Sequence, residues 1–469
     1  MLHIAARLRS VTSIVLLSSL TVGCGSDDTT GSAGGSGASP GSAGGSAGAS
    51  GGAAGISGTG GTSAGAGNLP AYVEPLETVD MNELPSDVPT VSLEVDPGAI
   101  DTLEADPFEA ADVTGTFIDG SGTRFEGVSV NFRGAYQLQN LMRSGNPQRN
   151  WKVKFSKEQM YRSRREWNLN YEPHLRQKLT YDLMKFAGVR CAEARHVLLL
   201  VNGEPHGLYL EYEDPDSKDF LEDRFGDRSG DLYKAATDLP GQTPYFATTE
   251  YLGDLDEDYF FHWQKKTNND LLPDDYSKLR AFLGALNGTA DADMEAFLSA
   301  NFDVEKFIRF LAVGNFVSHW DGLPQRPKNY WLYNVPAAGR WVFIPWDLDA
   351  TFEVETYGLN PMGTGASVFY QLDAHQGYQM SRGEGTERPL VRRMLRIPAI
   401  RARYVQNYKA ALGSYLSESY LLARIDALES LLEEHASSGD RETLNESSDT
   451  MRHFVSERFE RVSEELSGL

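Results

Sequence analysis

Cysteine is scarce in this chain, which has two cysteines, Cys24 and Cys191, among 469 residues. Cys24 lies in the N-terminal segment, so the rest of the chain has one thiol and no second cysteine for an internal disulfide. Val189 and Ala192 are its neighbours in the sequence. We expect Cys191 to be a small buried hydrophobe rather than a nucleophile.

Motifs of several common enzyme classes are also absent. The sequence contains no H-E-x-x-H, no G-x-S-x-G, no G-x-x-x-x-G-K-[ST] and no complete glycine-rich loop of ordinary protein kinases. Basic character is lacking too, because 43 Lys and Arg face 66 Asp and Glu, a net charge of -23. This balance argues against nucleic acid or an anionic lipid surface as the main partner. It leaves basic proteins, cations and neutral ligands.

Long apolar runs are missing, and the one short run lies near the N-terminus. Arg7 and Arg9 precede an apolar stretch over residues 11–22 that ends at Gly23 and Cys24. This pattern is typical of a signal peptide, and the stretch is too short to span a bilayer by itself. The segment before Cys24 resembles a bacterial lipoprotein cleavage box, although Thr21 replaces the usual Leu. We expect residues 1–24 to direct export and Cys24 to be lipidated, with an ordinary secretory signal as the alternative.

Residues 25–68 consist almost wholly of Gly, Ser, Ala and Thr. Such a composition cannot bury enough apolar surface to offset its ordering entropy, so we expect a flexible tether. A lipid anchor followed by this tether would hold a folded domain off a membrane surface. A low-complexity stretch without a role predicts the same disorder.

From residue 69 onward the composition is that of a globular chain, long enough for a large core or two lobes. The first half alternates apolar and polar residues with the period of β-strands. The expected strands are Thr90–Val95, Asp112–Ile118, Phe125–Phe132, Trp151–Phe155, His196–Val201 and Gly207–Glu213. A helical pattern runs from His174 to Ala187, and the Asn202-Gly203 step predicts a hairpin.

The second half has mainly helical periodicity. The expected helices are Ser277–Leu286, Met294–Ala300, Val304–Phe316 and much of Pro389–Ser467, and a hairpin is expected at Asn329–Tyr333 and Arg340–Pro345. A β-rich first part and a helix-rich second part predict an α+β protein with a cleft between two lobes.

Acidic side chains gather around the hairpin of the second half. The segment 344–352, IPWDLDATF, places Asp347 and Asp349 two residues apart after an apolar run. Asp321 closes the preceding helix and Asn329 begins the hairpin. Folding the hairpin back would bring these groups together, where they would repel one another unless a cation joined them. Oxygen ligands of this kind suit Mg²⁺ or Mn²⁺. Capping of a turn, or pairing with an arginine, is the alternative.

Several motifs in a fixed order resemble the spore-coat protein H (CotH) kinase family. They are RG at 133–134, WKVKF at 151–155, NLNYEPHLRQKLTYDLMKFAGV at 168–189, LLLVNGEPHGLYLEYED at 198–214, DLYK at 231–234, HWQKKTN at 262–268, SHWD at 318–321, KNYWLYN at 328–334 and FIPWDLDATF at 343–352. No single motif is decisive, but their joint order is specific. The resemblance runs from about Thr90 to Phe352.

The resemblance implies an atypical, two-lobed protein-kinase-like fold that uses ATP and a divalent cation. Asp321 in His-Trp-Asp matches the catalytic aspartate, which orients a substrate hydroxyl or accepts its proton. Asp347 matches the metal-binding aspartate, with Asn329 and then Asp349 as further ligands. About eight residues separate Asp321 from Asn329, whereas ordinary kinases have about five.

Phosphoryl transfer also requires cations around the phosphates. Strand alternation places Lys152 and Lys154 on one face, which in isolation predicts a solvated face. Beside the resemblance, one of them matches the phosphate-contacting lysine, and Lys152 is preferred. Glu213 is the expected partner of that lysine, with Glu211 as the alternative.

Further cations match positions of the family. Gly134 would let backbone N–H groups approach a phosphate that Arg133 binds bidentately, or the pair ends a strand in an exposed turn. Lys234 and Lys266 are candidates for a nucleotide contact or for a structural ion pair.

The domain prediction is a CotH-like kinase domain at 69–384, with a β-rich lobe at about 69–235 and a helical lobe with the metal site at about 236–384. Residues 385–469 form helices that pack on the second lobe. The predicted function is transfer of the ATP γ-phosphate to Ser or Thr of secreted or surface proteins, basic or serine-rich ones among them. The alternatives are a non-catalytic surface interaction protein and a metal-dependent phosphoesterase. The predicted location is a bacterial cell envelope, facing the periplasm or the exterior.

Overall fold

The computed structural model describes residues 80–134, 136–235, 246–270, 272–353, 363–370, 372 and 388–469. The chain divides into two units, Met1–Leu69 and Pro70–Leu469, and all described elements belong to the second unit. The predicted signal peptide, Cys24 and the tether lie outside the described residues. Within the described ranges, no helix combines the length and apolar character needed to cross a membrane.

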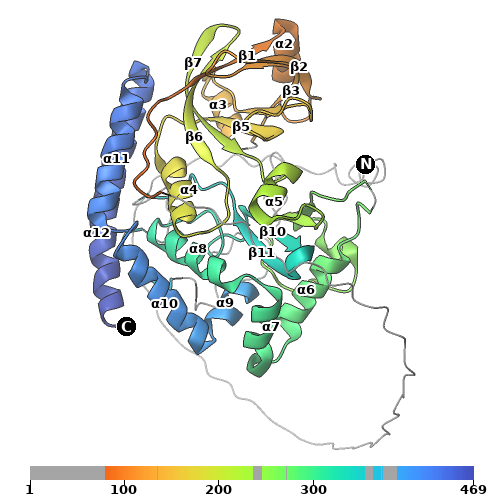
Figure 1. Cartoon of the computed structure of the whole chain (residues 1–469), viewed down its shortest axis with the longest axis vertical. Helices are drawn as coiled ribbons and strands as arrows, with labels where there is room; N and C mark the ends of the chain where they lie inside the picture. The colour runs from red at the N-terminus through yellow and green to blue at the C-terminus, as the bar shows by residue number, and fades with distance from the viewer. Residues whose placement is uncertain are drawn as a thin grey trace, which may run out of the picture. The chain divides into compact units, whose positions relative to one another are not determined.

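Seven strands of the described chain close into a barrel (Figure 1). In order of pairing they are β1 (Thr90–Val95), β2 (Val113–Ile118), β3 (Arg124–Phe132), β4 (Trp151–Lys154), β5 (Glu166–Tyr171), β7 (Glu204–Glu213) and β6 (Ala194–Val201). The β1–β6 pair is parallel and closes the barrel. Because side chains alternate along each strand, Val91, Leu93 and Val130 point into one apolar core.

Four helices accompany the barrel strands in the described sequence. They are α2 (Pro97–Ala105), α3 (Tyr136–Arg143), α4 (Arg176–Phe186) and α5 (Lys218–Phe225). The α2 helix begins where the Asp96 carboxylate accepts hydrogen bonds from the backbone N of Gly98 and Ala99. The α4 helix is buried on all sides from Gln177 to Met184. It therefore packs between other elements rather than on the surface.

A second, four-stranded sheet has the order β11-β10-β8-β9, in which every pair is antiparallel. Its strands are β8 (Leu232–Ala235), β9 (Trp263–Lys265), β10 (Tyr330–Val335) and β11 (Arg340–Pro345). A short 3-10 helix, η3 (Pro336–Ala338), followed by Gly339 with a φ of 63°, turns the chain between β10 and β11. Residues before β10 and after β11 are thereby held at the open end of this hairpin.

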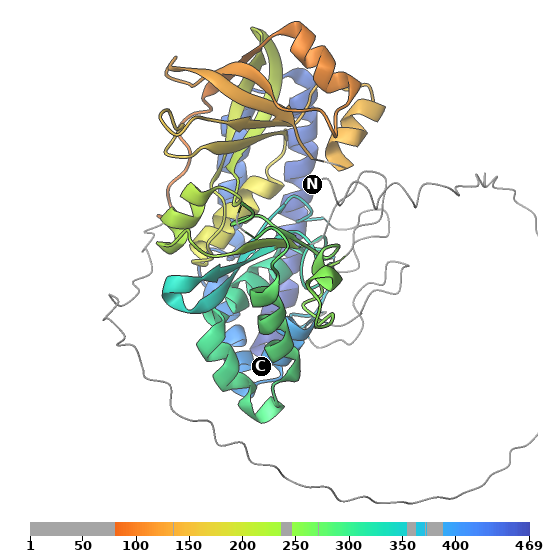
Figure 2. The same cartoon turned by 90° about the vertical axis from the view of Figure 1, so that its right-hand side faces the viewer.

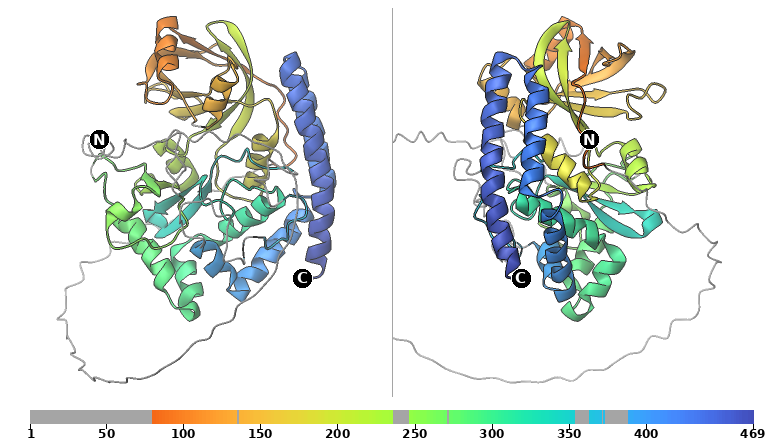
Figure 3. Two further views of the ribbon diagram at one scale, coloured as in Figure 1. Left: turned by 180° about the vertical axis from the view of Figure 1, so that it is seen from behind. Right: turned by 60° about the vertical axis from the view of Figure 1, so that its left-hand side comes forward.

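Helices dominate the rest of the described chain. They are α6 (Ser277–Gly288), α7 (Met294–Asn301), α8 (Val304–Phe316), α9 (Pro389–Leu395), α10 (Pro398–Leu412), α11 (Glu418–Glu433) and α12 (Ser438–Ser467). Their buried side chains join those of α4 in one apolar cluster. The α11 and α12 helices lie side by side as an antiparallel pair (Figure 2 and Figure 3).

The structure confirms a mixed α+β chain with a β-rich first part and a helix-rich second part. The six expected strands correspond to β1 to β4, β6 and β7, and the second hairpin corresponds to β10 and β11. Sequence patterns did not predict three strands, β5, β8 and β9, or three helices, α2, α3 and α5. In β5 the alternation is disguised, because Asn168 and Asn170 are buried polar residues within the strand.

The C-terminal helices contact the barrel as well as the second half. The Asp440 carboxylate near the start of α12 accepts a hydrogen bond from the hydroxyl of Tyr171 at 2.7 Å and one from the backbone N of Leu208 at 3.4 Å. The prediction that residues 385–469 pack on the second lobe therefore covers only part of their contacts.

Candidate functional site

The candidate site lies at the open end of the β10–β11 hairpin. The backbone N of Trp346 donates to the carbonyl of Asn329 at 3.1 Å, which extends the ladder beyond the Tyr330–Pro345 pair. Asn329 and Asp347 therefore leave neighbouring strands at one edge. Both have a left-handed backbone, with φ of 58° and 55°. Non-glycine residues in this region cost roughly 1–3 kcal/mol each, and such strain gathers at functional sites.

Asp321 lies in the turn that follows α8. Its carboxylate accepts from Arg326 Nη1 at 2.9 Å, from Lys328 Nζ at 2.9 Å and from Asn329 Nδ2 at 3.1 Å. Asn329 Nδ2 also donates to the Asp321 carbonyl at 2.9 Å. The amide nitrogen of Asn329 thus fixes the orientation of Asp321. Asn329 Oδ1 is then the one side-chain atom of Asn329 that can ligate a cation.

Asp347 and Asp349 lie directly after β11 in a more apolar setting. Burial raises the pKa of Asp349 to about 8, and the neighbouring Asp347 and Asp321 carboxylates add to this shift. Burial also raises the pKa of Asp347, against the opposing effect of Lys328 and Arg133. In the part of the chain that the structure describes, neither carboxylate has a hydrogen bond or a direct ion pair. Both shifts lie in the direction that a bound cation would reverse.

Glu172, at the end of β5, is a fourth carboxylate near this site, and sequence reasoning missed it. Its side chain is 2% exposed. Burial, followed by the charges of Asp349 and Asp347, raises its pKa well above the ordinary value. A signal existed in the sequence, because an acid between Tyr171 and Pro173 interrupts a stretch that is otherwise apolar or amide-bearing.

Arg133 is a cation near Asp347 at the hairpin end and near Asp214, which follows β7. Its Nη1 donates to Asn170 Oδ1 and to the Tyr212 hydroxyl, and its guanidinium lies over the Trp346 ring at 5.9 Å. Burial lowers its pKa, but the nearby Tyr212, Asp214 and Asp347 more than offset this, so the net shift is upward. Arg133 is therefore a fixed cation next to Asp347 rather than an exposed turn residue.

Gly134 follows Arg133 with a φ of 80°, a left-handed conformation that favours glycine. Lys234 on β8 places its Nζ over the ring of Trp331 at 5.9 Å. Its charge also lowers the pKa of Asp347, which places it on the same side of the second sheet as the candidate site. Lys234 and Arg133 thus reach Asp347 from different sheets.

The two candidate lysines of β4 differ in their surroundings. Lys152 Nζ lies 2.8 Å from Asp214 Oδ2 and 2.7 Å from Glu166 Oε2. Burial lowers the pKa of Lys152, but these two carboxylates outweigh burial and raise it. Lys154 Nζ lies 3.5 Å from Asp112 in a pair whose side chains are 41% and 40% exposed. Because Arg133 is also close to Asp214, the structure brings Lys152 toward the site and leaves Lys154 at the surface.

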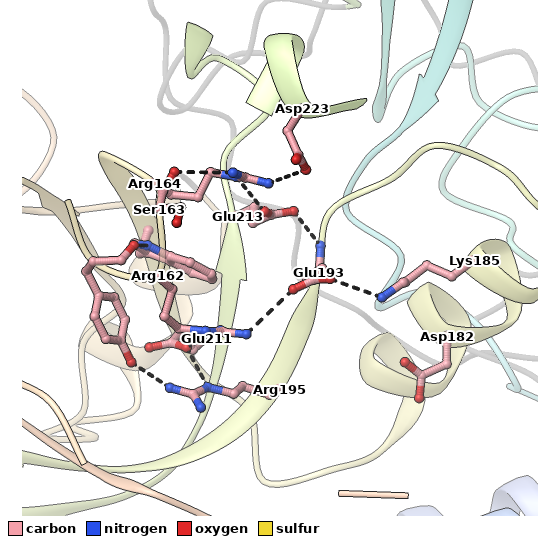
Figure 4. Close-up of polar contacts among 12 residues, drawn as sticks. Arg162, Ser163, Arg164, Asp182, Lys185, Glu193, Arg195, Glu211, Glu213 and Asp223 are labelled. Carbon is pink, nitrogen blue, oxygen red and sulfur yellow. Dashed lines mark hydrogen bonds and ion pairs between the residues drawn. The ribbon is translucent and has the colours of Figure 1, made fainter. Parts of the chain in front are cut away.

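The expected pairing of this lysine with Glu213, or with Glu211, is wrong. Glu213 is bound by Arg164 at 2.7 Å and accepts from the backbone N of Glu193 at 2.8 Å (Figure 4). Arg224 also binds Glu213, at 2.7 Å. Glu211 is bound by Arg162 and Arg195 instead. The strand register explains the error.

In that register Lys152 pairs with Asn168, and Asn168 pairs with Tyr212. Cross-strand partners point to the same face of a sheet, so Lys152 shares a face with Tyr212 and Asp214. The side chains of Glu211 and Glu213 point to the other face. Of the two alternatives for Lys266, the structure shows the ion pair, since Lys266 Nζ lies 3.5 Å from Asp216 Oδ2. Burial raises the pKa of Asp216, and Asp214 adds to this effect.

The predicted metal centre is only partly formed. Among the residues that the structure describes, no group of three or more His, Cys, Asp or Glu side chains has the spacing of a metal site. The Asp321 carboxylate instead forms ion pairs with Arg326 and Lys328. The prediction that three carboxylates meet at one point is therefore wrong for this structure. Asp347 and Asp349 still fit Mg²⁺ or Mn²⁺, since they are paired oxygen donors without a direct cationic partner among the described side chains.

Fold and site together define a mixed α+β protein with clustered acids and cations at the end of a hairpin. The chain belongs to the CotH kinase protein family, whose model matches residues 130–466. It is 28% identical over 218 residues to Inner spore coat protein H of Bacillus subtilis, covering 45% of this chain and 56% of that protein.

The chain is also 24% identical over 285 residues to Invasin CotH2 of Rhizopus delemar, covering 57% of this chain and 45% of that protein. It thus spans about half the length of the curated relatives that it matches. Among solved structures, a complex of HipA, HipB and operator DNA from Shewanella oneidensis has 12% identity and a TM-score of 0.27, covering 83% of this chain and 76% of that chain.

Proposed function

We propose that this chain is an atypical protein kinase that transfers the γ-phosphate of ATP to Ser or Thr of secreted or surface proteins. The observation that carries the proposal is the hairpin end, where Asp347 and Asp349 lie two residues apart, the charge of the nearby Asp321 raises the pKa of both, and Arg133 and Lys328 lower the pKa of Asp347. Phosphoryl transfer needs this combination, because cations neutralise the phosphates while acids position the nucleophile and the metal. Membership of a family described as kinase proteins supports it.

Each acid has a distinct role in this proposal. Asp321, fixed by the Asn329 amide, orients the substrate hydroxyl and accepts its proton. Asp347 and Asp349 would hold a Mg²⁺ or Mn²⁺ ion, with Asn329 Oδ1 as a further ligand. When bound, such an ion neutralises negative charge on the nucleotide phosphates. Glu172 lies close enough to this pair for the charges of Asp349 and Asp347 to raise its pKa, so a cation bound to the pair would also favour the ionised form of Glu172.

In this proposal, cationic side chains bind the phosphates of ATP. Arg133, Lys152 and Lys234 would approach from the barrel and the second sheet. Lys328 lies between Asp321, which it contacts at 2.9 Å, and Asp347, whose pKa it lowers. A phosphate that draws Lys328 away would leave Asp321 Oδ2 with only the hydrogen bond from Asn329, so that it could also accept one from the substrate hydroxyl. Substrate binding and activation of the base are thereby linked.

The site of action in this proposal is the cell surface. The matched relatives have names that place them in a spore coat or describe them as invasins. Residues 1–24 have the pattern of a lipoprotein signal, so Cys24 would anchor the protein through the tether. With a net charge of -23, the chain would favour basic or serine-rich protein substrates over acidic ones.

One observation favours a second candidate, a non-catalytic interaction protein on the same fold. Asp321 is already neutralised by Arg326 and Lys328, as a structural carboxylate would be. In that case the cluster stabilises the hairpin end and binds no nucleotide. A metal-dependent phosphoesterase would use the same acids, but no observation favours it over the kinase.

Labelled ATP with Mn²⁺ distinguishes these functions. For the purified full-length protein we expect label on protein, whereas free phosphate without protein label indicates the esterase. Absence of both, with no thermal shift from nucleotide, indicates the interaction protein. Asp347→Ala should abolish the shift that nucleotide and Mn²⁺ produce, while Asp321→Asn should retain the shift and lose transfer. Equal activity of both variants would remove the site assignment.

A further inference from the structure

A cavity of about 400 Å³ lies between β6, α4, α11 and the segment 80–89, here called the strap. Arg424 Nη1 on α11 donates to the carbonyls of Met81 and Glu83 at 3.3 and 3.1 Å. The backbone N of Leu198 on β6 donates to the Pro89 carbonyl at 3.0 Å. The strap is thus fastened to both sides of the cavity. Small-molecule sites have volumes of roughly 300–1,000 Å³ and lie between packed substructures, as this cavity does.

One wall of the cavity is apolar. Phe186 at the end of α4 and Leu428, Leu431 and Leu432 on α11 line it, together with Leu84 of the strap. Leu84 is 42% exposed, so the cavity has an apolar margin at the surface. Binding of a hydrocarbon group here would be favourable in proportion to the apolar area removed from water.

The rest of the lining, apart from the strap, is here called the charged wall and carries more cations than acids. Five cationic side chains line it, and their ion pairs involve three carboxylates. The cations are Arg162, Lys178, Lys185, Arg195 and Arg424, and the carboxylates are Asp182, Glu193 and Glu211. Each carboxylate is shared by two of these cations. The wall therefore has positive charge that the paired acids do not neutralise.

The shared carboxylates form a chain that Figure 4 shows. Lys185 Nζ lies 3.3 Å from Glu193, and Arg162 contacts Glu193 at 3.5 Å and Glu211 at 2.9 Å. Arg195 contacts the same Glu211 oxygen at 2.7 Å. The shortest ion-pair distance of Lys185 is 3.3 Å, longer than the shortest one of each of the other four cations, and its partner Glu193 is 41% exposed. Lys185 is therefore the cation most able to bind a ligand.

A residue of the cavity lining also has a buried donor without an acceptor. Arg424 is 5% exposed, lines the cavity and shares Asp182 with Lys178. Its Nε has no hydrogen-bond partner among the described residues. A buried guanidinium N–H without an acceptor is unfavourable, and an anionic ligand that accepts its hydrogen bond would remove that cost.

The strap contributes Asp80, Glu83 and Asp87 to the rim of the cavity. All three are exposed, and none forms an ion pair within the described residues. Exposed carboxylates are screened by water and salt, so they do not compensate the cations of the wall.

We propose that this cavity binds a small amphipathic molecule with an anionic head, a carboxylate or a phosphate. The head would meet Lys185 and Arg424, and the apolar body would lie against Leu431 and its neighbours on α11. The inference does not depend on the proposed kinase function, because the binding test contains no nucleotide.

The test is calorimetric titration of the full-length protein with four probes: octanoate, octyl phosphate, octanol and acetate. We expect octanoate or octyl phosphate to bind at least about tenfold more tightly than octanol and acetate, since only they offer both head and tail. The anionic probe that binds more tightly, octanoate or octyl phosphate, identifies the head group of the ligand. Lys185→Met should weaken that probe about tenfold and leave octanol unchanged. Lys409→Met on the exposed face of α10 is the matched control and should change nothing.

A second variant tests the apolar wall independently. Leu431→Ser should weaken the eight-carbon probes and leave acetate unchanged, and thermal melting of each variant checks that it is folded. The inference is overturned if neither anionic probe binds at about 1 mM, or if octanol binds as tightly as both. It is also overturned if a folded Lys185→Met protein binds the anionic probe as the unaltered protein does.

Discussion

Single side chains at the candidate site have protonation states that differ from those of free amino acids. Asp349 is the clearest case, because burial and the nearby Asp347 and Asp321 raise its pKa to about 8. The folded chain therefore holds a proton on Asp349 at pH values at which the unfolded chain has lost it. A cation at Asp347 and Asp349 would have to displace that proton, so cation binding and pH are linked.

The sign of the pH dependence follows from proton counting. Between the ordinary aspartate pKa of 3.8 and the folded value of about 8, the folded state binds more protons than the unfolded state. The free energy of unfolding therefore falls as pH rises through this window. We expect the metal-free protein to melt at a higher temperature at pH 5 than at pH 8, and Mn²⁺ to stabilise it most at pH 8.

Asp349→Asn is the variant that checks this prediction. It should remove the part of the decline between pH 5 and pH 8 that Asp349 contributes and stabilise the metal-free protein at pH 8 by about 1–3 kcal/mol, the cost of an unsatisfied buried charge. Thermal melts across this pH range measure it. An unchanged decline in the variant would assign the pH dependence to other groups.

Lys152 and Lys154 form a matched pair at the residue scale. Lys152→Met leaves Asp214 and Glu166 without their shared cation, so we expect a loss of about 1–3 kcal/mol in the free energy of unfolding. Lys154→Met removes an exposed pair with Asp112 and should change stability by less than about 0.5 kcal/mol. Denaturant titration measures both.

The same pair tests the nucleotide site. Nucleotide affinity should fall in Lys152→Met and stay unchanged in Lys154→Met. Equal losses in the two variants would contradict the assignment of Lys152 to the site.

At the scale of elements, sequence patterns predicted strands and turns wherever residues close in sequence determine them. Alternation in Thr90–Val95 and the Asn202-Gly203 turn correspond to β1 and to the β6–β7 hairpin. Closure of the barrel could not be predicted, because it depends on the parallel pairing of β1 with β6, about a hundred residues apart in sequence. The sequence pattern contains no information on such a distant register.

The candidate site shows the same limit. Asp347 and Asn329 could be placed together because one hairpin joins them. The partner of Lys152 could not, because it depends on the register of three strands, and a shift of one residue exchanges Glu213 for Asp214. The cations on Asp321 were missed although Lys328 directly precedes Asn329, because sequence spacing does not show how the turn after α8 folds back.

The α12 helix fastens the elements that carry the site. Arg458, fully buried, donates to the carbonyls of Thr364 and Asn315 at 3.0 and 3.1 Å and to Asn315 Oδ1 at 2.7 Å. One turn earlier, Phe454 packs on Phe352 with ring centroids 5.7 Å apart. These residues hold the end of α8, which precedes Asp321, and the segment that follows Asp349.

Arg458→Met should therefore affect stability and the candidate site together. Loss of these hydrogen bonds leaves buried carbonyls without donors, and we expect a loss of about 3 kcal/mol in the free energy of unfolding. Arg461→Met, on an exposed part of α12, should cost less than about 0.5 kcal/mol. If transfer activity is found, kcat should fall in Arg458→Met more than KM for ATP changes. A variant with normal stability and kcat would show that α12 does not position the site.

At the scale of the whole molecule, the folding unit is larger than the family match. The match begins at residue 130, within β3, whereas β1 and β2 lie before it. β1 pairs with both β2 and β6, and Leu93 and Phe117 lie in the barrel core. A chain that begins at residue 130 would expose the edges of β3 and β6 and lose these apolar side chains.

Two deletions test this boundary. A chain of residues 70–469 retains every described element and should keep the melting temperature of the full-length protein within about 2 °C, since residues 1–69 form the other unit. A chain of residues 130–469 should lose the barrel and aggregate, because unpaired strand edges and open cores associate. Circular dichroism melting and gel filtration measure both. A monomeric 130–469 chain with an unchanged melting temperature would show that the barrel does not need β1, and the extent of the folding unit would then follow the family match.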